Sequence, residues 1–316
     1  MPKLSKAERS HKKSPEAAQP PEAQRRQSLN QSVRSTTNTP QKNMGLLITI
    51  EGGEFTGKSS VVIPALKTVF EHCGIETLTS REPGGTARGE EIRQEIFAKL
   101  KEGATAHELA TLFNKARRIH LDEVIIPLLG ENKEQPKIVL LDRYLDSTRI
   151  YQGLEAGVPM KEIKALEDEY VRGYFPDLTL ILHFPEDQFK KTFTLRKTFA
   201  DQQTNNRDIN LWDEANLEKH IARQHKYLQS PDLAKQWNES RAFELVNAAQ
   251  HPHSVISDAA LACLPFLKII KNTVSSTQLE QTLRLLKTHE LWQELNSYFN
   301  EQQTIAASLN IPEPVS

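Results

Sequence analysis

The sequence predicts an α/β protein in which a parallel sheet is covered by helices on both faces. Two observations lead to this prediction. Short apolar segments alternate along the chain with longer segments of helical periodicity, which is the order expected of βαβ units. A glycine-rich segment, Gly52–Ser59, follows the first expected strand and precedes a helix, which is where such folds commonly bind phosphate groups.

The expected strands are short and mostly apolar, as strands buried on both faces are. They cover Leu46–Ile50, Glu76–Thr79, Lys137–Leu141, Leu178–Phe184 and Ala242–Val246. Between and after them, apolar residues recur at the spacing of one helix face. The expected helices cover Ser60–His72, Glu90–Lys101, His107–Leu129, Met160–Gly173 and Pro252–Leu267. We therefore expect one domain over residues 44–267.

The two ends of the chain differ from this domain. Residues 1–43 carry nine Lys or Arg against three Glu, a net charge of +6, with few apolar side chains. Such a segment buries too little surface to offset the entropy of ordering, so we expect a disordered basic tail. A targeting peptide is the alternative, although an amphipathic apolar face is missing. Residues 268–316 form an extension in which Thr277–Glu301 has the apolar face of an extra C-terminal helix.

The composition favours a protein of the cytoplasm. Of the 316 residues, 38% are hydrophobic and 26% charged, and the net charge is −1, so the chain lacks the basic footprint of a nucleic-acid partner. Cys73 and Cys263 have no Cys or His nearby at metal-ligand spacing. No apolar run reaches the about 18 residues of a membrane span, and no signal-peptide core follows Met1. We expect neither a nucleic-acid nor a membrane partner.

The glycine-rich segment matches the P-loop pattern G-x-x-x-x-G-K-S, so the fold is expected to be of the P-loop NTPase type. Glycines permit a tight turn in which backbone N–H groups point inward beside a helix N-terminus. Lys58 is placed to reach the β- and γ-phosphates, and Ser59 to ligate Mg²⁺. The residues expected to bind ATP are Gly52, Gly53, Glu54, Phe55, Thr56, Gly57, Lys58, Ser59 and Ser60.

The P-loop pattern alone leaves GTPases, ATPases and small-molecule kinases open. GTPases are disfavoured because no Asn-Lys-x-Asp guanine motif is present. From about Leu46 to Leu267, the chain resembles thymidylate (dTMP) kinases in their bacterial form. The segments that carry the resemblance are Ile50–Glu54, Arg81–Thr86 with Gly89–Arg93, Phe113–Arg117, and Asp142–Tyr144 with Ser147, Thr148 and Tyr151–Gly153. The resemblance implies Mg²⁺-assisted phosphorylation of dTMP by ATP, and a homodimer.

The resemblance also implies roles in a nucleoside pocket. Phe113 would stack on thymine, and Arg117 would hydrogen-bond the base. Without the resemblance, a core aromatic and a solvated helical charge would be the simpler interpretations. Tyr151 would lie against the deoxyribose, although a packing role fits the sequence equally well. The other expected substrate contacts are Arg81, Ser147, Thr148 and Gln152.

Asp142 and Arg143 end an expected strand, where parallel sheets place their ligands. Asp142 would act as a Walker-B-like carboxylate, so Ser59 and Asp142 are the expected metal ligands. Arg143 would hold the 5′-phosphate of dTMP, and a structural salt bridge with Asp142 is the alternative. A carboxylate inside a phosphate loop requires a donor or a cation, and the resemblance places Glu54 near the sugar 3′-hydroxyl and the metal.

The position of a further catalytic arginine is left open. Phe55 follows Glu54 where some thymidylate kinases carry an arginine. The bacterial form supplies arginines from a mobile lid, which here would cover residues of about 190–212 and contain Arg196 and Arg207. Arg207 is the favoured catalytic residue. The alternatives to a dTMP kinase are a kinase for another deoxynucleoside monophosphate and a catalytically weakened nucleotide-binding protein.

Overall fold

The fold is built on a sheet of five parallel strands in the order β2-β3-β1-β4-β5. The strands are β1 (Gly45–Gly52), β2 (Glu76–Arg81), β3 (Lys137–Asp142), β4 (Leu178–His183) and β5 (Ala242–Asn247). This computed structural model describes residues 45–129, 137–202, 216–271 and 274–286, with the single positions 293 and 300. The parallel sheet is confirmed, and each strand lies close to its predicted bounds.

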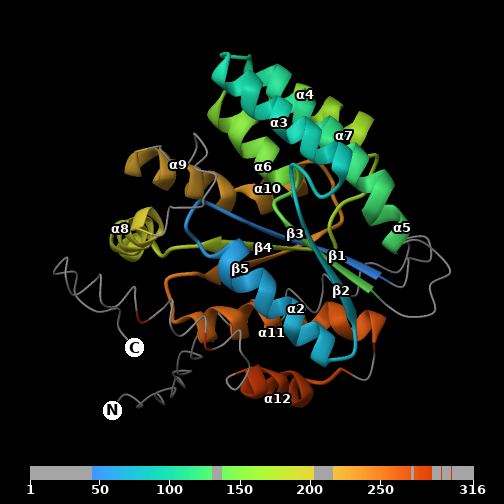
Figure 1. The fold of residues 1–316 in the computed structure, drawn as a ribbon, viewed down its shortest axis with the longest axis vertical. Helices are drawn as coiled ribbons and strands as arrows, with labels where there is room; N and C mark the ends of the chain where they lie inside the picture. Colours follow the sequence, from blue (N-terminus) through green and yellow to red (C-terminus); the bar gives the residue numbers. More distant parts are fainter. Residues whose placement is uncertain are drawn as a thin grey trace, which may run out of the picture. The chain divides into compact units, whose positions relative to one another are not determined.

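Helices cover both faces of the sheet, as the sequence predicts (Figure 1). On one face lie α2 (Ile63–His72) and α11 (Pro252–Ile270), which Figure 1 shows below the strands. From the other side, the strands are contacted by α5 (Ile126–Leu129), α6 (Leu145–Thr148) and α9 (Leu217–Leu228). Above that side, three helices pack together: α3 (Ala87–Lys101), α4 (Ala106–His120) and α7 (Met160–Tyr170).

The central strand β1 is buried along its whole length. Successive side chains of a strand point to opposite faces of the sheet. Ile48 and Ile50 accordingly enter the core between the sheet and the helices α2 and α11. Leu47 packs with Leu121 and Ile125 on the other side of the sheet. Burial on both faces explains why this strand shows a continuous apolar run instead of alternation.

The helices depart from the prediction in two ways. The continuous helix expected over His107–Leu129 is divided by a π-helical turn, η2 (Leu121–Ile125), and the helix after the glycine-rich segment also starts with one, η1 (Lys58–Val62). Several helices were missed: η3 (Arg149–Glu155), α6, α8 (Glu186–Gln202), α9 and α10 (Ser230–Gln236). In α9 the side chains buried at helical spacing are His220, Arg223, Gln224 and Tyr227, so an apolar pattern was absent.

The last described helix, α12 (Ser276–Leu286), packs on α2 and α11. Its Leu279 and Leu283 enter the same core as β1. Just before it, the Nζ atom of Lys271 donates to the carbonyl oxygens of Cys73 (2.9 Å) and Gly74 (3.0 Å), where α2 ends. The predicted C-terminal helix is thus present as far as Leu286. The part of that prediction beyond Leu286, apart from the single positions 293 and 300, and the predicted tail 1–43 lie outside the described residues.

Helix α11 is long and apolar enough to cross a membrane by length and composition alone. Its side chains Val255, Ile256, Ala259, Cys263 and Leu267 are buried in the core under the sheet. Packing against β1, β4 and β5 accounts for the apolar composition of this helix.

Candidate functional site

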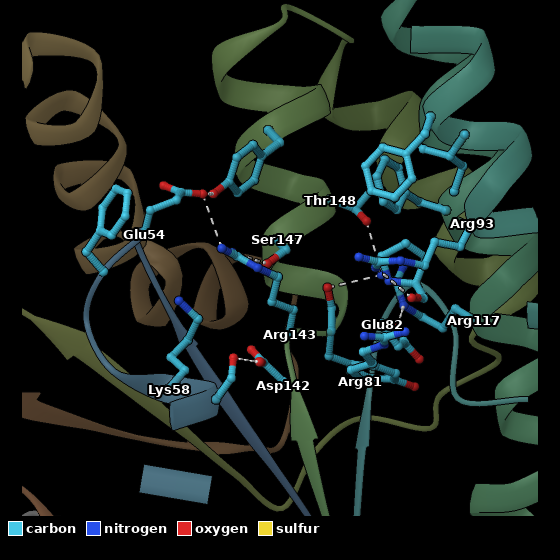
Figure 2. A pocket seen from close by; sticks show the side chains of 18 of the residues that line it. Glu54, Lys58, Arg81, Glu82, Arg93, Arg117, Asp142, Arg143, Ser147 and Thr148 are labelled. Atoms are coloured by element: carbon cyan, nitrogen blue, oxygen red, sulfur yellow. Dashed lines mark hydrogen bonds and ion pairs between the residues drawn. The ribbon is translucent and has the colours of Figure 1, made fainter. Parts of the chain in front are cut away.

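A cavity of about 410 Å³ lies at the carboxyl ends of β1, β2 and β3. Its size is that of a pocket for a small organic ligand. The predicted site residues that line it are Glu54, Phe55, Gly57, Lys58, Ser59, Ser60, Arg81, Phe113, Arg117, Asp142, Arg143, Ser147, Thr148, Tyr151 and Gln152. Figure 2 shows two groups of side chains, one around Lys58, Asp142 and Arg143 and the other around Glu82 and Arg117. Residues far apart in the sequence therefore share one site.

The glycine-rich loop after β1 closes around Lys58. Gly52 has a φ of +135°, and a Cβ there would lie 2.3 Å from the carbonyl oxygen of Leu182, so only glycine fits. The Lys58 ammonium donates to the carbonyl oxygens of Gly52 (3.0 Å) and Gly53 (2.6 Å). Burial, together with the charge of Arg143, lowers the pKa of Lys58 to about 8.

Ser59 and Asp142 meet beside this loop. The Ser59 hydroxyl donates to Oδ2 of Asp142 (Figure 2). Oδ1 of Asp142 is buried and has no hydrogen-bond partner among the described residues. A buried polar atom normally has a partner, and hard cations such as Mg²⁺ prefer oxygen ligands. The two side chains therefore fit a divalent cation between them.

Arg143 lies at the centre of the cavity, in the left-handed conformation with a φ of +68°. Its Nη1 donates to the hydroxyls of Tyr227 (2.8 Å) and Ser147 (3.2 Å), and its Nη2 to Oε1 of Glu54 (3.2 Å). A non-glycine residue in this conformation is uncommon and costs energy, and such strain often occurs at functional sites.

Glu54 has the cations that its position requires. Besides Arg143, Nη1 of Arg223 donates to its Oε2 at 2.8 Å, and the Tyr151 hydroxyl donates to its Oε1. Burial alone would raise the pKa of Glu54, but His220, Arg143 and Arg223 hold it well below its usual value. Glu54 is therefore a buried, ionised carboxylate that is held by two arginines.

Arg223 is a site residue that the sequence analysis missed. Its Nε and Nη2 donate to the two carboxylate oxygens of Glu155 at 2.8 and 2.7 Å, while its guanidinium lies 4.4 Å from the centre of the Tyr151 ring. The available signal was Glu54 itself, because a buried carboxylate in a phosphate loop implies a second cation. That cation comes from α9, which is 169 residues away in the chain.

Glu51, the residue before the loop, fixes the turn that follows β3. Its Oε1 accepts from the backbone N–H groups of Tyr144 (2.7 Å) and Ser147 (3.3 Å), and its Oε2 accepts from the Ser147 hydroxyl (2.8 Å). Burial and the nearby Asp146 carboxylate raise the pKa of Glu51 to about 7. Arg143 lies directly before this turn, so Glu51 indirectly sets its position.

The other end of the cavity is built around Arg117, which is only 2% exposed. Its guanidinium donates to Oε2 of Glu82 (2.7 Å) and Oγ1 of Thr148 (3.1 Å). It also donates to Oδ1 of Asn114 (2.9 Å) and to the carbonyl oxygen of Tyr144 (3.0 Å). Arg117 is therefore a buried and fully oriented side chain, so the alternative of a solvated helical charge is wrong.

Aromatic side chains from two helices border this end. Phe113 of α4 lines the cavity while packing against the small core of Ile96, Leu109 and Leu112. The sequence analysis missed Phe97 of α3, which also lines the cavity and lies 4.9 Å below the Arg93 guanidinium. An apolar, aromatic wall opposite a fixed donor suits a planar base.

Of the two lid arginines considered, Arg196 is described. It belongs to α8 and lines the cavity. Its Nη1 donates to the carbonyl oxygen of Phe55 (3.2 Å) and its Nη2 to that of Ala248 (2.5 Å). Arg207, the favoured residue of the sequence analysis, lies outside the described residues. Arg81 is an exposed lining residue and pairs with Glu90 at 3.1 Å.

Comparison with known proteins agrees with this geometry. Residues 50–226 match the family model described as thymidylate kinase. The chain is also similar to a thymidylate kinase of Clostridium novyi (strain NT), with 36% identity over 179 residues, which are 56% of this chain and 80% of that protein. All residues that line the cavity fall within the matched range.

Proposed function

The chain belongs to the thymidylate kinase family, and we propose that its cavity is where it phosphorylates dTMP to dTDP with ATP. It is a nucleoside monophosphate kinase, and nothing in the comparisons favours the alternative substrates considered from the sequence. The observation that carries the assignment of the site is that one cavity joins a phosphate loop to a base-sized compartment, with Arg143 between them.

At the phosphate end, the backbone N–H groups of the loop and Lys58 bind the phosphates of ATP. Ser59 and Asp142 would hold Mg²⁺, whose charge lowers the energy of the transferring phosphoryl group. The unpartnered Oδ1 of Asp142 supports this role. Lys58 now donates to loop carbonyls, so it exchanges these contacts for phosphate oxygens when ATP binds.

The acceptor phosphate of dTMP is held by Arg143. Its guanidinium is kept in place by Glu54, Ser147 and Tyr227, which preorganises positive charge where the reaction needs it. A phosphate monoester has a second pKa of about 6 and is ionised at pH 7. The reaction therefore needs positioning and positive charge more than a general base.

The base lies against Phe113 and is recognised by Arg117. A guanidinium carries five N–H donors, and Arg117 uses four of them on the protein. One Nη1–H has no partner in the part of the chain that the structure describes, and we assign it to a base carbonyl. Tyr151, whose hydroxyl is fixed on Glu54, borders the sugar, and Ser147, Thr148, Gln152 and Arg81 complete the lining.

The further catalytic arginine is proposed to be Arg196. Its bond to the Phe55 carbonyl already places the guanidinium beside the phosphate loop, where it can stabilise charge on the transferring group. Arg207 stays a prediction from the sequence. The family is one of soluble enzymes, and from family membership we further propose a homodimer in the cytoplasm. We propose residues 44–267 as the catalytic domain, between the tail 1–43 and the extension 268–316.

A coupled assay of ADP release with each of the four deoxynucleoside monophosphates tests the function. We expect release with dTMP and little with dAMP, dCMP or dGMP; no release with any of them would overturn the assignment. At saturating substrates, Arg196→Ala should lower kcat about a hundredfold or more, as for other arginines that contact a transferring phosphoryl group. If Arg207→Ala has this effect instead, the lid assignment is reversed.

A further inference from the structure

We propose that Glu82 and His120 are positioning residues for base recognition, because together they orient the guanidinium of Arg117. The proposal rests on the proposed function of the cavity and adds residues that do not themselves touch the substrate. It concerns a buried chain of hydrogen bonds that runs from Ser80 through His120 and Glu82 to Arg117.

Glu82 provides the only negative charge among the groups that the Arg117 guanidinium contacts in the described residues. The two side chains are 3% and 2% exposed, and Oε2 of Glu82 lies 2.7 Å from Nε of Arg117. A charge-assisted bond of this kind is strong and directional in the interior. The guanidinium plane rotates about the Cδ–Nε bond. A hydrogen bond from Nε–H to Glu82 restricts this rotation and therefore determines where the Nη atoms point.

His120 holds the other oxygen of Glu82. Its ring is completely buried, with Nδ1 at 3.2 Å from Oε1 of Glu82 and Nε2 at 2.9 Å from Oγ of Ser80. A carboxylate oxygen accepts hydrogen bonds, so Nδ1 of His120 donates to Oε1 of Glu82, and Nε2 faces the Ser80 hydroxyl. Without this bond, the Glu82 carboxylate could rotate, and the Arg117 guanidinium bound to it would change its orientation.

The order serine, histidine, carboxylate also occurs in hydrolytic triads. The surroundings here favour a role in orienting Arg117 over a role of Ser80 as a nucleophile. The second oxygen of Glu82 is bound to Arg117. Gly85, with a φ of +80°, packs so closely that a Cβ there would lie 2.5 Å from Oγ of Ser80 and 2.6 Å from Nε2 of His120. Its backbone therefore covers the serine and histidine where a substrate would have to approach.

The consequence for binding is confined to one end of the cavity. Loss of the Nδ1 donor leaves Oε1 of Glu82 buried without a partner and lets the last free N–H of Arg117 turn away from the base. We expect dTMP binding to weaken about tenfold, which is the loss of about one buried hydrogen bond. ATP binding should change little, because Lys58 and Asp142 lie at the other end of the cavity (Figure 2).

The test uses histidine variants that differ in which ring nitrogen they replace. His120→Asn keeps an N–H donor at the position of Nδ1, whereas His120→Gln keeps a polar group only at the position of Nε2, and His120→Leu keeps neither. Calorimetry gives Kd for dTMP and for ATP, and steady-state kinetics gives kcat and KM. His107→Leu is the matched control, because His107 lies on the same helix, has a side chain that is 54% exposed, and pairs through that side chain with Glu162 at the surface.

We expect His120→Gln and His120→Leu to raise Kd and KM for dTMP about tenfold, with kcat and the ATP affinity nearly unchanged. His120→Asn should restore most of the dTMP affinity. Equal dTMP affinity in the Gln, Leu and wild-type proteins would overturn the inference, and so would an Asn variant as weak as the Gln variant.

Retained ATP binding shows that a variant is folded. If the His120 variants do not fold, Glu82→Gln removes the charge with little change of shape, and an unchanged Kd for dTMP in that variant overturns the proposal. Failure of the proposed function is recognised separately: wild-type protein would then neither bind nor phosphorylate dTMP. Wild-type binding with unaffected variants would contradict only the positioning role.

Discussion

Lys58 shows how much the chemistry of the site depends on single buried groups. Its ammonium is surrounded by carbonyl oxygens of its own loop, and burial lowers its pKa from 10.5 to about 8. A lysine is a useful phosphate ligand only while it is charged. The free enzyme therefore carries, at the proposed ATP site, a group that titrates close to physiological pH.

This pKa predicts a pH dependence of ATP binding. Below about pH 8, Lys58 of the free enzyme is protonated and binds phosphates directly; above that pH it must first take up a proton. We expect Kd for ATP to rise toward tenfold per pH unit above about pH 8, with proton uptake seen by calorimetry in buffers of different ionisation enthalpy. Lys58→Arg, which stays charged, should show no such rise. A constant Kd up to about pH 9.5 in the wild type would contradict the prediction.

At the residue scale, the sequence predicted the groups with a fixed local pattern. Lys58 and Ser59 follow from the loop motif, and Asp142 and Arg143 from the end of a strand, and the structure brings all four into one cavity. Arg223 and Glu155 could not be found in this way, because their pairing with Glu54 is made only by the tertiary fold. A buried polar pair has no periodic signature in a sequence.

At the element scale, a buried ion network ties the helices behind the site to the sheet. Arg149 of η3 donates to Glu167 of α7 (2.8 Å) and Glu239 (3.1 Å), the latter just before β5. Arg241 joins Glu239 (2.8 Å) to Asp146 of α6 (2.8 Å). All five side chains are almost completely buried. The network holds the turn that carries Ser147 and Thr148 into the cavity.

Breaking this network should be costly. Arg149→Ala would leave Glu167 buried without its cation and Glu239 with Arg241 as its remaining cation, and removing one partner of a buried ion pair costs about 3–5 kcal/mol. We expect a loss of unfolding free energy of about that size in urea denaturation. Arg172→Ala is the control, because Arg172 is exposed and bonds only a backbone carbonyl of its own turn among the described residues. Equal stability of the two variants would show that the network is not needed.

Prediction was most successful for the strands and least successful for the helices with polar buried faces. Strands β1, β3 and β4 have the apolar runs that burial on both sides requires. Helix α9 buries His220, Arg223, Gln224 and Tyr227 instead, and α6 and η3 bury Asp146 and Arg149. These helices were missed because buried polar residues of the site and of the ion network take the place of the apolar face by which a helix is recognised in a sequence.

For the molecule as a whole, α12 lies outside the matched range and is nevertheless part of the main core. Leu279 and Leu283 are buried beside β1, α2 and α11, and Oγ1 of Thr282 lies 4.0 Å from Sγ of Cys73 at the end of α2. Helix α2 continues from the turn that carries Lys58 and Ser59. The described part of the extension therefore supports the helix on which the phosphate loop is built.

Shortening a core side chain of α12 should destabilise the whole domain. Leu279 is fully buried, and Leu→Ala changes at such sites cost about 2–5 kcal/mol. We expect Leu279→Ala to shift the urea midpoint by that amount, with kcat for dTMP unchanged in the folded enzyme. Leu285→Ala, on the 59% exposed side chain of the same helix, should have little effect. A Leu279 variant as stable as the wild type would mean that α12 unfolds independently.

In the proposed binding mode, the one N–H of Arg117 that has no partner among the described residues would determine which pyrimidines the enzyme rejects. A guanidinium donates hydrogen bonds and accepts none, and its other four donors are already fixed on the protein. A base with a carbonyl at that point completes the set, whereas an amino group, as on cytosine, would place donor against donor. Discrimination between thymine and cytosine would then come from the lack of an acceptor on the Arg117 guanidinium. No rotation of that side chain can offer an acceptor to the amino group of cytosine.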